Sequence, residues 1–375
     1  LNKNTGDSRF GKRVAISSEF AIVGAYRAKK AFIFKNTGGI WGSAAAFTLD
    51  KNTGDSYFGY SVAISSEFAI VGTYHAKKAF IFKNTGGTWD TTAAFTLNDK
   101  NAGESRFGTS VAISSEFAIV GAFGANKAFI FKNTGGKWGT TAAFNLDQNT
   151  GDSYFGYNVA ISSEFAIVGT SGTNKAFIFK NTGGTWGTTA AFTLDQNTED
   201  TGFGTAVAVS SKFAIVGAYL SNKAFIFKNT GGIWGTTAAF TLDQNTEDKH
   251  FGTGVAISFD FAIVGASSAN KAFIFKNTGG TWGTTAAINL DQNTGDSSFG
   301  YSVAISSQFA IVGAPSAANA SIFRSSNVVA KYGPIENWDM SEVTDMSYLF
   351  YNKKLFNSDL SKWMVSKVTT MQSST

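Results

Sequence analysis

The chain has 375 residues, a net charge of +5 and no cysteine. It can therefore form no disulfide, no thiolate metal site and no cysteine nucleophile. No apolar stretch approaches the roughly 18 residues that a membrane-spanning helix needs, so we expect no membrane span. The basic excess is local, because residues 10–57 hold seven Lys and Arg against three Asp and Glu. We therefore expect no nucleic-acid partner.

A Phe-Gly pair recurs along the chain at intervals of 48 residues, with one interval of 49. The seven pairs begin at Phe10, Phe58, Phe107, Phe155, Phe203, Phe251 and Phe299. A period of this length with several short apolar runs in each copy is typical of a propeller or a solenoid. Because such copies bury one continuous core by stacking, the repeat rather than the length sets the number of domains.

The copy at residues 155–202 shows the strands that we expect in each repeat. Apolar and β-branched runs predict strands at 159–162, 165–169, 175–180 and 188–194. Their connections are short, and residues 181–184 (Asn-Thr-Gly-Gly) form a hairpin turn. Short connections join neighbouring antiparallel strands. The sequence thus predicts an all-β fold, a seven-bladed propeller of four-stranded antiparallel blades over residues 1–324. A superhelical solenoid is the alternative.

The run FGYSVAISSQFAIVGAP at 299–315 is the fullest copy of the motif. It resembles the FG-GAP repeat, which builds the propeller of integrin α subunits and of many surface proteins, and the resemblance extends over about residues 1–324. It implies a propeller at a cell surface or outside the cell, but no particular function. Members of that family often carry an Asp-rich calcium loop between the first two strands. Here that connection is only Ser17-Ser18-Glu19, too short to wrap a cation, so we do not expect that site.

The last copy ends at Arg324 without the Gly-Gly-x-Trp segment that follows the third strand in every other copy. At the other end, Leu1-Asn2 aligns with Leu49-Asp50, which predicts that the sequence starts in the middle of a repeat. A strand upstream of Leu1 could complete the last blade, and we favour this source. The alternative is residues 328–332, so residues 325–336 are interpreted as a linker or a closing strand.

Residues 337–375 carry a second repeat. Trp338 and Trp363 are 25 residues apart, as are Val343 and Val368. The segment NWDMSEVTDMSYLF resembles the repeats of BspA-like surface proteins, which form leucine-rich-repeat-like solenoids. The resemblance implies a small solenoid-like α/β segment of about one and a half copies. Since about three such copies are needed for stability, we expect more chain beyond Thr375, or docking of this segment onto the propeller or a neighbouring molecule.

Two sets of connections differ between the copies, while the others hardly change. The variable ones precede each Phe-Gly pair or join the second and third strands, and a propeller places both sets on one face. Tyrosine is frequent there, and its amphipathic ring suits sugars and protein partners. The candidate ligand-binding residues are Tyr26, Tyr57, Tyr60, Tyr74, Tyr154, Tyr157, Tyr219 and Tyr301. The alternative is that turn geometry fixes one face while the other drifts without a function.

Basic residues of the first copy form a candidate anion patch on the same face. Its members are Arg9, Lys12, Arg13, Arg27, Lys29 and Lys30. A local basic patch attracts anions such as sulfated or uronic polysaccharide. The alternative is a solvated rim.

The sequence offers two further candidate sites. Calcium could bind oxygen atoms of the DQNTGDS loops, at Asp147, Asn149 and Asp152 or at Asp291, Asn293 and Asp296. The Gly and Asp are swapped relative to a calcium loop and no Glu follows, so we favour a solvated turn and expect no cofactor. Asn319-Ala320-Ser321 is a candidate N-glycosylation site.

Catalysis has little support. The two histidines, His75 and His250, lie in distant copies without a recognisable nucleophile partner, and no phosphate-binding glycine loop is present. We predict a non-enzymatic extracellular structural or adhesion protein. Its propeller would be a rigid scaffold that docks to other protein chains, copies of itself included, in a surface assembly or filament. The alternative is a glycan-binding, lectin-like module that uses the tyrosine-rich face.

Overall fold

The computed structural model describes residues 1, 9–50, 57–98, 106–147, 154–195, 202–243, 249–291, 298–324, 344–346 and 365–370. The chain divides into two compact units, Leu1–Ser325 and Ser326–Thr375, which are described separately. None of the helices described is long and apolar enough to cross a membrane.

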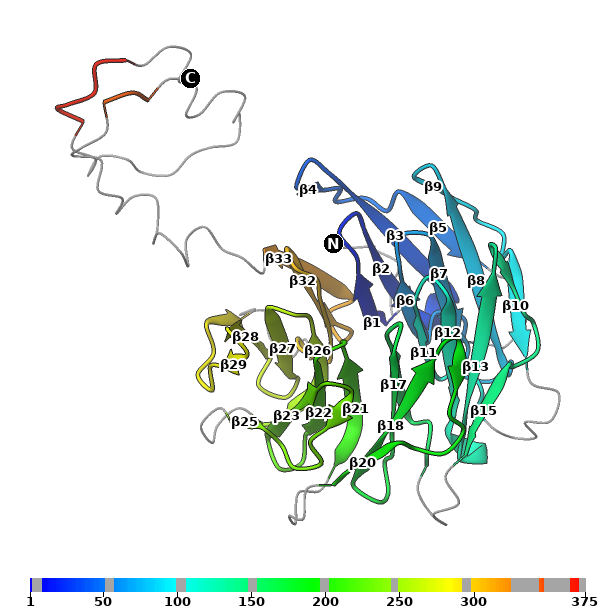
Figure 1. The fold of residues 1–375 in the computed structure, drawn as a ribbon. Helices are drawn as coiled ribbons and strands as arrows, with labels where there is room; N and C mark the ends of the chain where they lie inside the picture. Colours follow the sequence, from blue (N-terminus) through cyan, green and yellow to red (C-terminus); the bar gives the residue numbers. More distant parts are fainter. Residues whose placement is uncertain are drawn as a thin grey trace. The chain divides into compact units, whose positions relative to one another are not determined.

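The first unit consists of seven antiparallel sheets arranged around a ring, with the first strand of each sheet innermost (Figure 1). The prediction of an all-β, seven-bladed propeller is therefore confirmed. Blade 1 contains β1 (Phe10–Ile16), β2 (Phe20–Ala25), β3 (Lys30–Thr37), β4 (Ile40–Trp41) and β5 (Phe47–Asp50). Blade 2 contains β6 (Ser61–Ile64), β7 (Phe68–Gly72), β8 (Lys78–Thr85), β9 (Thr88–Trp89) and β10 (Phe95–Asn98). Blade 3 contains β11 (Ser110–Ile113), β12 (Phe117–Ala122), β13 (Lys127–Thr134), β14 (Lys137–Trp138) and β15 (Phe144–Asp147).

The remaining blades repeat this order. Blade 4 contains β16 (Asn158–Ile161), β17 (Phe165–Gly169), β18 (Lys175–Thr182), β19 (Thr185–Trp186) and β20 (Phe192–Asp195). Blade 5 contains β21 (Phe203–Val209), β22 (Phe213–Ala218), β23 (Lys223–Thr230), β24 (Ile233–Trp234) and β25 (Phe240–Asp243). Blade 6 contains β26 (Phe251–Ile257), β27 (Phe261–Ala266), β28 (Lys271–Thr278), β29 (Thr281–Trp282) and β30 (Ile288–Asp291). Blade 7 contains β31 (Ser302–Ile305), β32 (Phe309–Ala314) and β33 (Asn319–Arg324), and short 3-10 turns η1 (Tyr26–Ala28) and η2 (Phe123–Ala125) follow β2 and β12.

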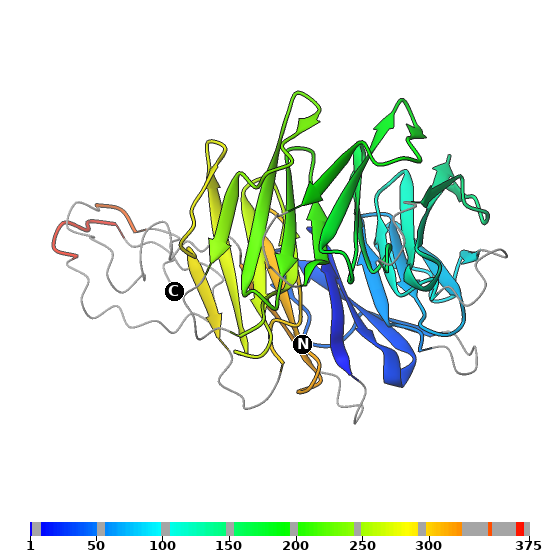
Figure 2. The same cartoon turned by 90° about the horizontal axis from the view of Figure 1, so that it is seen from below.

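The outer strand of each complete blade differs from the single run that the sequence predicts. In blade 4 it consists of β19 and β20, which both pair with β18, instead of one strand over 188–194. The predicted third strand also extends to Thr182, because the two glycines that turn the chain, Gly183 and Gly184, have φ of 60° and 87°. These hairpins project from one face of the ring (Figure 2). Small residues between β19 and β20 leave the ladder and rejoin it where the Ala191 N–H donates to the Ile178 carbonyl at 2.8 Å.

Apolar side chains fill the space between neighbouring sheets. Along each strand alternate residues point to opposite faces, so both faces of every blade contribute to a core. The outer-strand tryptophan of one blade packs edge-on against the phenylalanine that begins the second strand of the preceding blade, as Trp89 does on Phe20 with ring centroids 5.4 Å apart. This Phe-Trp contact recurs between neighbouring blades and adds an aromatic contact to each shared core.

The Phe-Gly pair joins one blade to the next. Phe58 is fully buried, with its ring 5.6 Å from that of Phe80. Gly59 has φ of +88°, and a Cβ on it would lie 2.2 Å from the Lys30 carbonyl oxygen of the preceding blade. Only glycine fits there, because the two backbones approach too closely for any side chain.

Blade 7 and blade 1 close the ring. Gly11 approaches the Asn319 carbonyl as Gly59 approaches that of Lys30. Trp41 packs on Phe309 with ring centroids 5.4 Å apart. The outer edge of β33 is less covered than its counterparts, since Ile322 and Phe323 are half-buried whereas the equivalent residues of the other third strands are fully buried.

The second unit is described at only two short segments. Asp345 and Thr370 form a parallel bridge, and the Met346 N–H donates to the Thr370 carbonyl at 2.8 Å. The bridged residues are 25 positions apart, the period of the second repeat, so the two described segments pair at equivalent repeat positions. The proposed linker at 325–336 and the two tryptophans of this repeat, Trp338 and Trp363, lie outside the described residues.

Candidate functional site

The two variable sets of connections meet between adjacent blades. Tyr26, in the connection after β2, has its ring 5.4 Å from that of Tyr57, which precedes the Phe-Gly pair of the next blade. Residues from these two connections and from the start of each first strand therefore share one face of the ring. We call it the variable face.

Aromatic residues of blades 1 and 2 form one continuous group on the variable face. Tyr60 lies 5.5 Å from Tyr26 and 4.8 Å from Tyr74, measured between ring centroids. His75 lies 5.2 Å from Tyr57 and 4.6 Å from Tyr74. All of these rings are tilted or edge-on rather than stacked, which is the favourable arrangement for aromatic pairs. We call Tyr26, Tyr57, Tyr60, Tyr74 and His75 the tyrosine cluster.

Arg106 of blade 3 extends the tyrosine cluster. Its guanidinium lies 4.4 Å from the Tyr74 ring centroid, a cation–π distance, and its Nη1 lies 3.5 Å from His75 Nδ1. These residues and Lys77 line a hollow of about 200 Å³. Neither Arg106 nor His75 is among the predicted site residues. Arg106 could have been identified from its place in the repeat, because it is the residue equivalent to Tyr57 in the next copy.

The backbone at that repeat position is left-handed in every blade. Its φ is 44° at Tyr57, 55° at Arg106 and 45° at Tyr154. Glycine adopts this conformation without strain, and Gly202 occupies the position in blade 5. A bulky side chain in this conformation costs about 1 kcal/mol of conformational free energy relative to glycine. Tyr and Arg therefore occupy a position that the backbone conformation disfavours for them.

The other predicted tyrosines lie in separate groups. Tyr154 and Tyr157 pack against Phe123 of blade 3, with ring centroids 5.9 Å and 5.6 Å away. Tyr219 of blade 5 packs on His250 at 5.4 Å. The eight candidate tyrosines therefore form several aromatic groups around the ring instead of one site.

The central channel opens within the variable face. It is lined by residues of all seven first strands and has a volume of about 150 Å³. Valines form one layer of the lining, and the layer nearer the mouth holds Arg13 and smaller residues, three of them serines. Serines of this layer also join the blades, as where Ser61 Oγ accepts a hydrogen bond from the Val111 N–H at 3.1 Å.

At the channel mouth, blade 1 contributes Lys12 and Arg13, and blade 7 contributes Tyr301. Lys12 Nζ donates a hydrogen bond to Tyr301 Oη. The Arg13 guanidinium lies 5.6 Å from the centroid of the Tyr301 ring. Burial alone would raise the pKa of the Tyr301 phenol, but Arg13 and Lys12 outweigh it and hold that pKa below its ordinary value. Burial in turn lowers the pKa of Lys12.

Two more tyrosines border the mouth. Burial raises the pKa of Tyr60 to about 12, although Arg13 opposes this. Burial also raises the pKa of Tyr157. The charge of Arg13 thus acts on phenols of three different blades, which places it centrally among Tyr60, Tyr157 and Tyr301.

The predicted anion patch is only partly assembled. Lys12 and Arg13 lie together at the channel mouth. Arg9 reaches blade 7, with Nη1 3.5 Å from Ser316 Oγ, and Lys30 pairs with Asp50 of its own blade at 3.9 Å. Arg27 and Lys29 belong to the connection around η1. The six cations therefore do not converge on one point.

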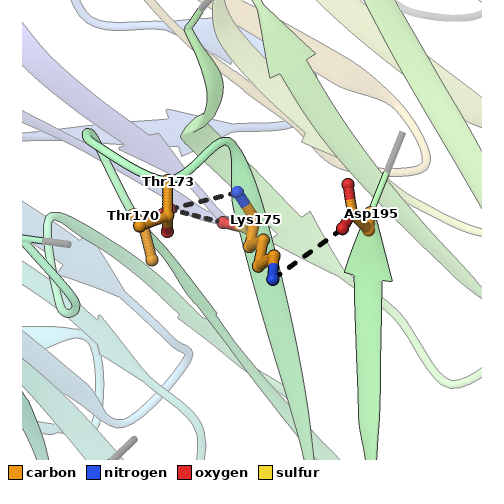
Figure 3. Close-up of polar contacts among 4 residues, drawn as sticks. All are labelled: Thr170, Thr173, Lys175 and Asp195. Carbon is orange, nitrogen blue, oxygen red and sulfur yellow. Dashed lines mark hydrogen bonds and ion pairs between the residues drawn. The ribbon is translucent and has the colours of Figure 1, made fainter. Parts of the chain in front are cut away.

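Blade 4 shows how the variable-face connections are fixed where no aromatic cluster forms (Figure 3). Thr170 Oγ1 donates to the Lys175 carbonyl at 2.9 Å and accepts from the Lys175 N–H at 3.2 Å. Lys175 Nζ lies 3.9 Å from Asp195 Oδ2, and Thr173 Oγ1 lies 3.2 Å from Thr170 Oγ1. These polar groups satisfy one another, so this connection is a structural turn.

The calcium and glycosylation candidates are placed as follows. Asp147 ends β15 opposite Lys127, and Asp291 ends β30 opposite Lys271. Asn149, Asp152, Asn293 and Asp296 lie outside the described residues. Within the described ranges no three acidic or histidine side chains gather as a metal site would require. Asn319 begins β33, half-buried and paired with Ala314.

Comparisons with known families match two parts of the chain. The FG-GAP repeat family matches residues 89–136. A family described as "Mycoplasma protein of unknown function, DUF285" matches residues 319–374. The first match supports the resemblance of the propeller repeats. The second shows that the C-terminal part resembles a different family from the propeller repeats and does not identify it as BspA-like. No curated protein matches the chain.

Solved structures share the propeller fold. A streptogramin B lyase structure matches with a TM-score of 0.61 and 12% identity, covering 84% of this chain and 93% of that one. A selenomethionine-substituted virginiamycin B lyase from Staphylococcus aureus matches with a TM-score of 0.59 and 13% identity, covering 84% of this chain and 94% of the other. At these identities the similarity shows the fold alone.

Proposed function

We propose that this protein is a non-enzymatic, extracellular scaffold that docks to other protein chains of a surface assembly through the tyrosine cluster. The observation that carries the proposal is the packing of Tyr57 and Tyr74 with Arg106 across two adjacent blades. Tyrosine and arginine are among the residues that contribute most to protein–protein binding energy. The FG-GAP repeats, which are typical of extracellular interaction modules, support the location and the role.

Two properties of the propeller favour such a role. The blades are nearly identical, and each is fixed to the next by buried Phe-Gly and Phe-Trp contacts, so the face is rigid before any partner arrives. A rigid face loses little conformational entropy on binding. Tyr57 is also kept in a left-handed conformation that glycine would adopt without strain, and strained residues concentrate at functional sites.

The repeats themselves supply substitutions that the fold accepts. Ser298 occupies the position of Tyr57, and Ser171 occupies that of Tyr74. Tyr57→Ser and Tyr74→Ser should therefore remove cluster rings without unfolding a blade. Tyr219→Ser is the matched control, because Tyr219 has the same repeat position as Tyr74 but lies outside the cluster.

The first partner to test is a second copy of the chain. We expect sedimentation velocity and electron microscopy of the full chain to show concentration-dependent assembly. The two cluster variants should weaken it by about tenfold or more, and Tyr219→Ser should not. If the full chain stays monomeric, the second test is capture of one identified surface protein. The proposal is supported if the parent chain and Tyr219→Ser capture that protein and the two cluster variants do not. Equal capture by all four proteins would contradict it.

Glycan binding is the second candidate function. It is favoured by the exposure of Tyr154 and Tyr157, whose side chains are 56% and 38% exposed beside Phe123. Exposed aromatic rings suit the apolar faces of sugars. A glycan array should then show binding that Tyr157→Thr abolishes, since Thr109 shows that threonine fits this repeat position. Binding that Tyr157→Thr leaves intact would count against this function.

A further inference from the structure

The channel mouth carries two cations beside the tyrosine cluster, with Lys12 Nζ 5.9 Å from the centroid of the Tyr60 ring. Arg13 is the one charged side chain among the described residues that line the channel. Lys12 lies beside it, partly buried, and donates a hydrogen bond to the Tyr301 hydroxyl. Among the residues described at this mouth no carboxylate faces either cation. Burying cations without an opposite charge is costly, so the mouth favours an anion supplied from outside.

The fold does not require these two cations. At the position of Arg13 the other six blades have Ser61, Ser110, Asn158, Ala206, Gly254 and Ser302. The serine is useful to the ring, since Ser302 Oγ accepts a hydrogen bond from the Val14 N–H at 3.1 Å. At the position of Lys12 three blades have threonine and three have tyrosine. Blade 1 is thus the only blade that places cations at these two positions.

Size and chemistry limit the anion. The channel, of about 150 Å³, admits one small group rather than a folded segment. Its walls carry hydroxyl groups and valine side chains. The mouth itself is bordered by the phenols of Tyr60, Tyr157 and Tyr301. Phenol hydroxyls both donate and accept hydrogen bonds, so they complement a ligand that carries hydroxyl groups next to its charge.

We propose that the channel mouth binds the carboxylate of an acidic saccharide between Arg13 and Lys12. The Arg13 guanidinium supplies paired donors that match the two oxygen atoms of a carboxylate, and Lys12 supplies a further donor. The phenols of Tyr60 and Tyr157 receive the hydroxyl groups of the same sugar. The inference shares Tyr60 with the tyrosine cluster but does not rest on docking by that cluster, because Arg13 and Lys12 carry it and the ligand is of a different kind.

The test is isothermal titration calorimetry of the full chain with trigalacturonate, compared with neutral galactotriose. The variants are Arg13→Ser and Lys12→Thr, both taken from other blades at the same positions. The control is Lys137→Thr, which removes one exposed charge remote in sequence and also copies a residue that other blades carry there. Thermal unfolding checks that each variant remains folded.

We expect trigalacturonate to bind and galactotriose not to bind. Each mouth variant should weaken the affinity by about tenfold or more, because each removes a charged hydrogen-bond donor from a desolvated site, and Lys137→Thr should leave it unchanged. Arg13→Lys should retain part of the affinity, since it keeps the charge but loses the paired donors.

Three results would overturn the proposal. The first is an affinity that Arg13→Ser does not change. The second is a loss of affinity in Lys137→Thr as large as that in the mouth variants, which would mean that net charge attracts the ligand unspecifically. The third is tighter binding of tetraglutamate than of trigalacturonate, which would assign the site to acidic peptides.

Discussion

Leu1 and Ala320 pair across the two ends of the propeller. The Leu1 amino group donates to the Ala320 carbonyl at 2.7 Å, and the Ala320 N–H donates to the Leu1 carbonyl at 3.1 Å. Leu49 and Ala31 are paired in the same register within blade 1. Leu1 therefore occupies the outer-strand position of blade 7, where the alignment of Leu1 with Leu49 predicts it.

This pairing predicts that a longer outer strand would stabilise the ring. Phe261 is half-buried and, within the described residues, lacks the tryptophan contact that Phe213 has with Trp282. Fusing a second copy of residues 38–48 in front of Leu1 would place a tryptophan on Phe261 and cover the edge of β33. We expect the free energy of unfolding to rise by at least about 2 kcal/mol in chemical denaturation. The same fusion with serine in place of its tryptophan should lose most of the gain, and equal stability of both fusions would contradict the register.

The Phe-Gly glycines should tolerate no side chain. Gly59→Ala would place a Cβ 2.2 Å from the Lys30 carbonyl oxygen at a φ of +88°, so the two blades must separate. We expect a loss of at least about 3 kcal/mol in the free energy of unfolding. Gly86→Ala is the control, since its φ is +61° but no atom lies within 4 Å of the new Cβ. It should cost about 1 kcal/mol, and similar losses for both variants would refute the close-approach explanation.

Blade 7 can be improved by copying its neighbours. Ala318 has φ of 50°, a conformation in which asparagine is favoured over alanine. Asn222 is the equivalent residue of blade 5. Its Oδ1 accepts a hydrogen bond from the His250 N–H at 2.6 Å, which connects blade 5 to blade 6. Ala318→Asn should raise the free energy of unfolding by about 1 kcal/mol, measured by chemical denaturation. Ala317→Asn, one residue earlier, should give no gain.

Alkaline titration should separate two tyrosines. The pKa of Tyr60 is raised to about 12 in the folded chain. Between about pH 10 and pH 12 the unfolded chain therefore loses this proton while the folded chain keeps it, so the free energy of unfolding falls. The lowered pKa of Tyr301 has the opposite effect, because the folded chain ionises first and gains stability as the pH rises to about 10. Ultraviolet titration of phenolate absorbance should show the earliest ionisation disappearing in Tyr301→Phe and the latest in Tyr60→Thr. An unchanged late ionisation in Tyr60→Thr would contradict the assignment.

The candidate site was predictable in outline and not in detail. Variation between copies identified the variable face, and it placed Tyr26 and Tyr57 on it. It could not show that their rings meet, because they are 31 residues apart and come from different blades. Arg106 also lies at a variable position, but the sequence alone does not show its contact with Tyr74, which is 32 residues earlier.

The sequence by itself determined the fold, because a Phe-Gly pair repeated at near-constant intervals imposes the same local strands and the same close backbone approach in every copy. It also determined the register of the last blade, since Leu1 aligns with Leu49 in the repeat. Only the tertiary structure decided which variable residues act together. Closing the ring brings Lys12 and Arg13 of the first blade against Tyr301 of the last, and separates Lys30, paired with Asp50, from that group. Such contacts depend on the number of blades and the curvature of the ring, which no single repeat contains.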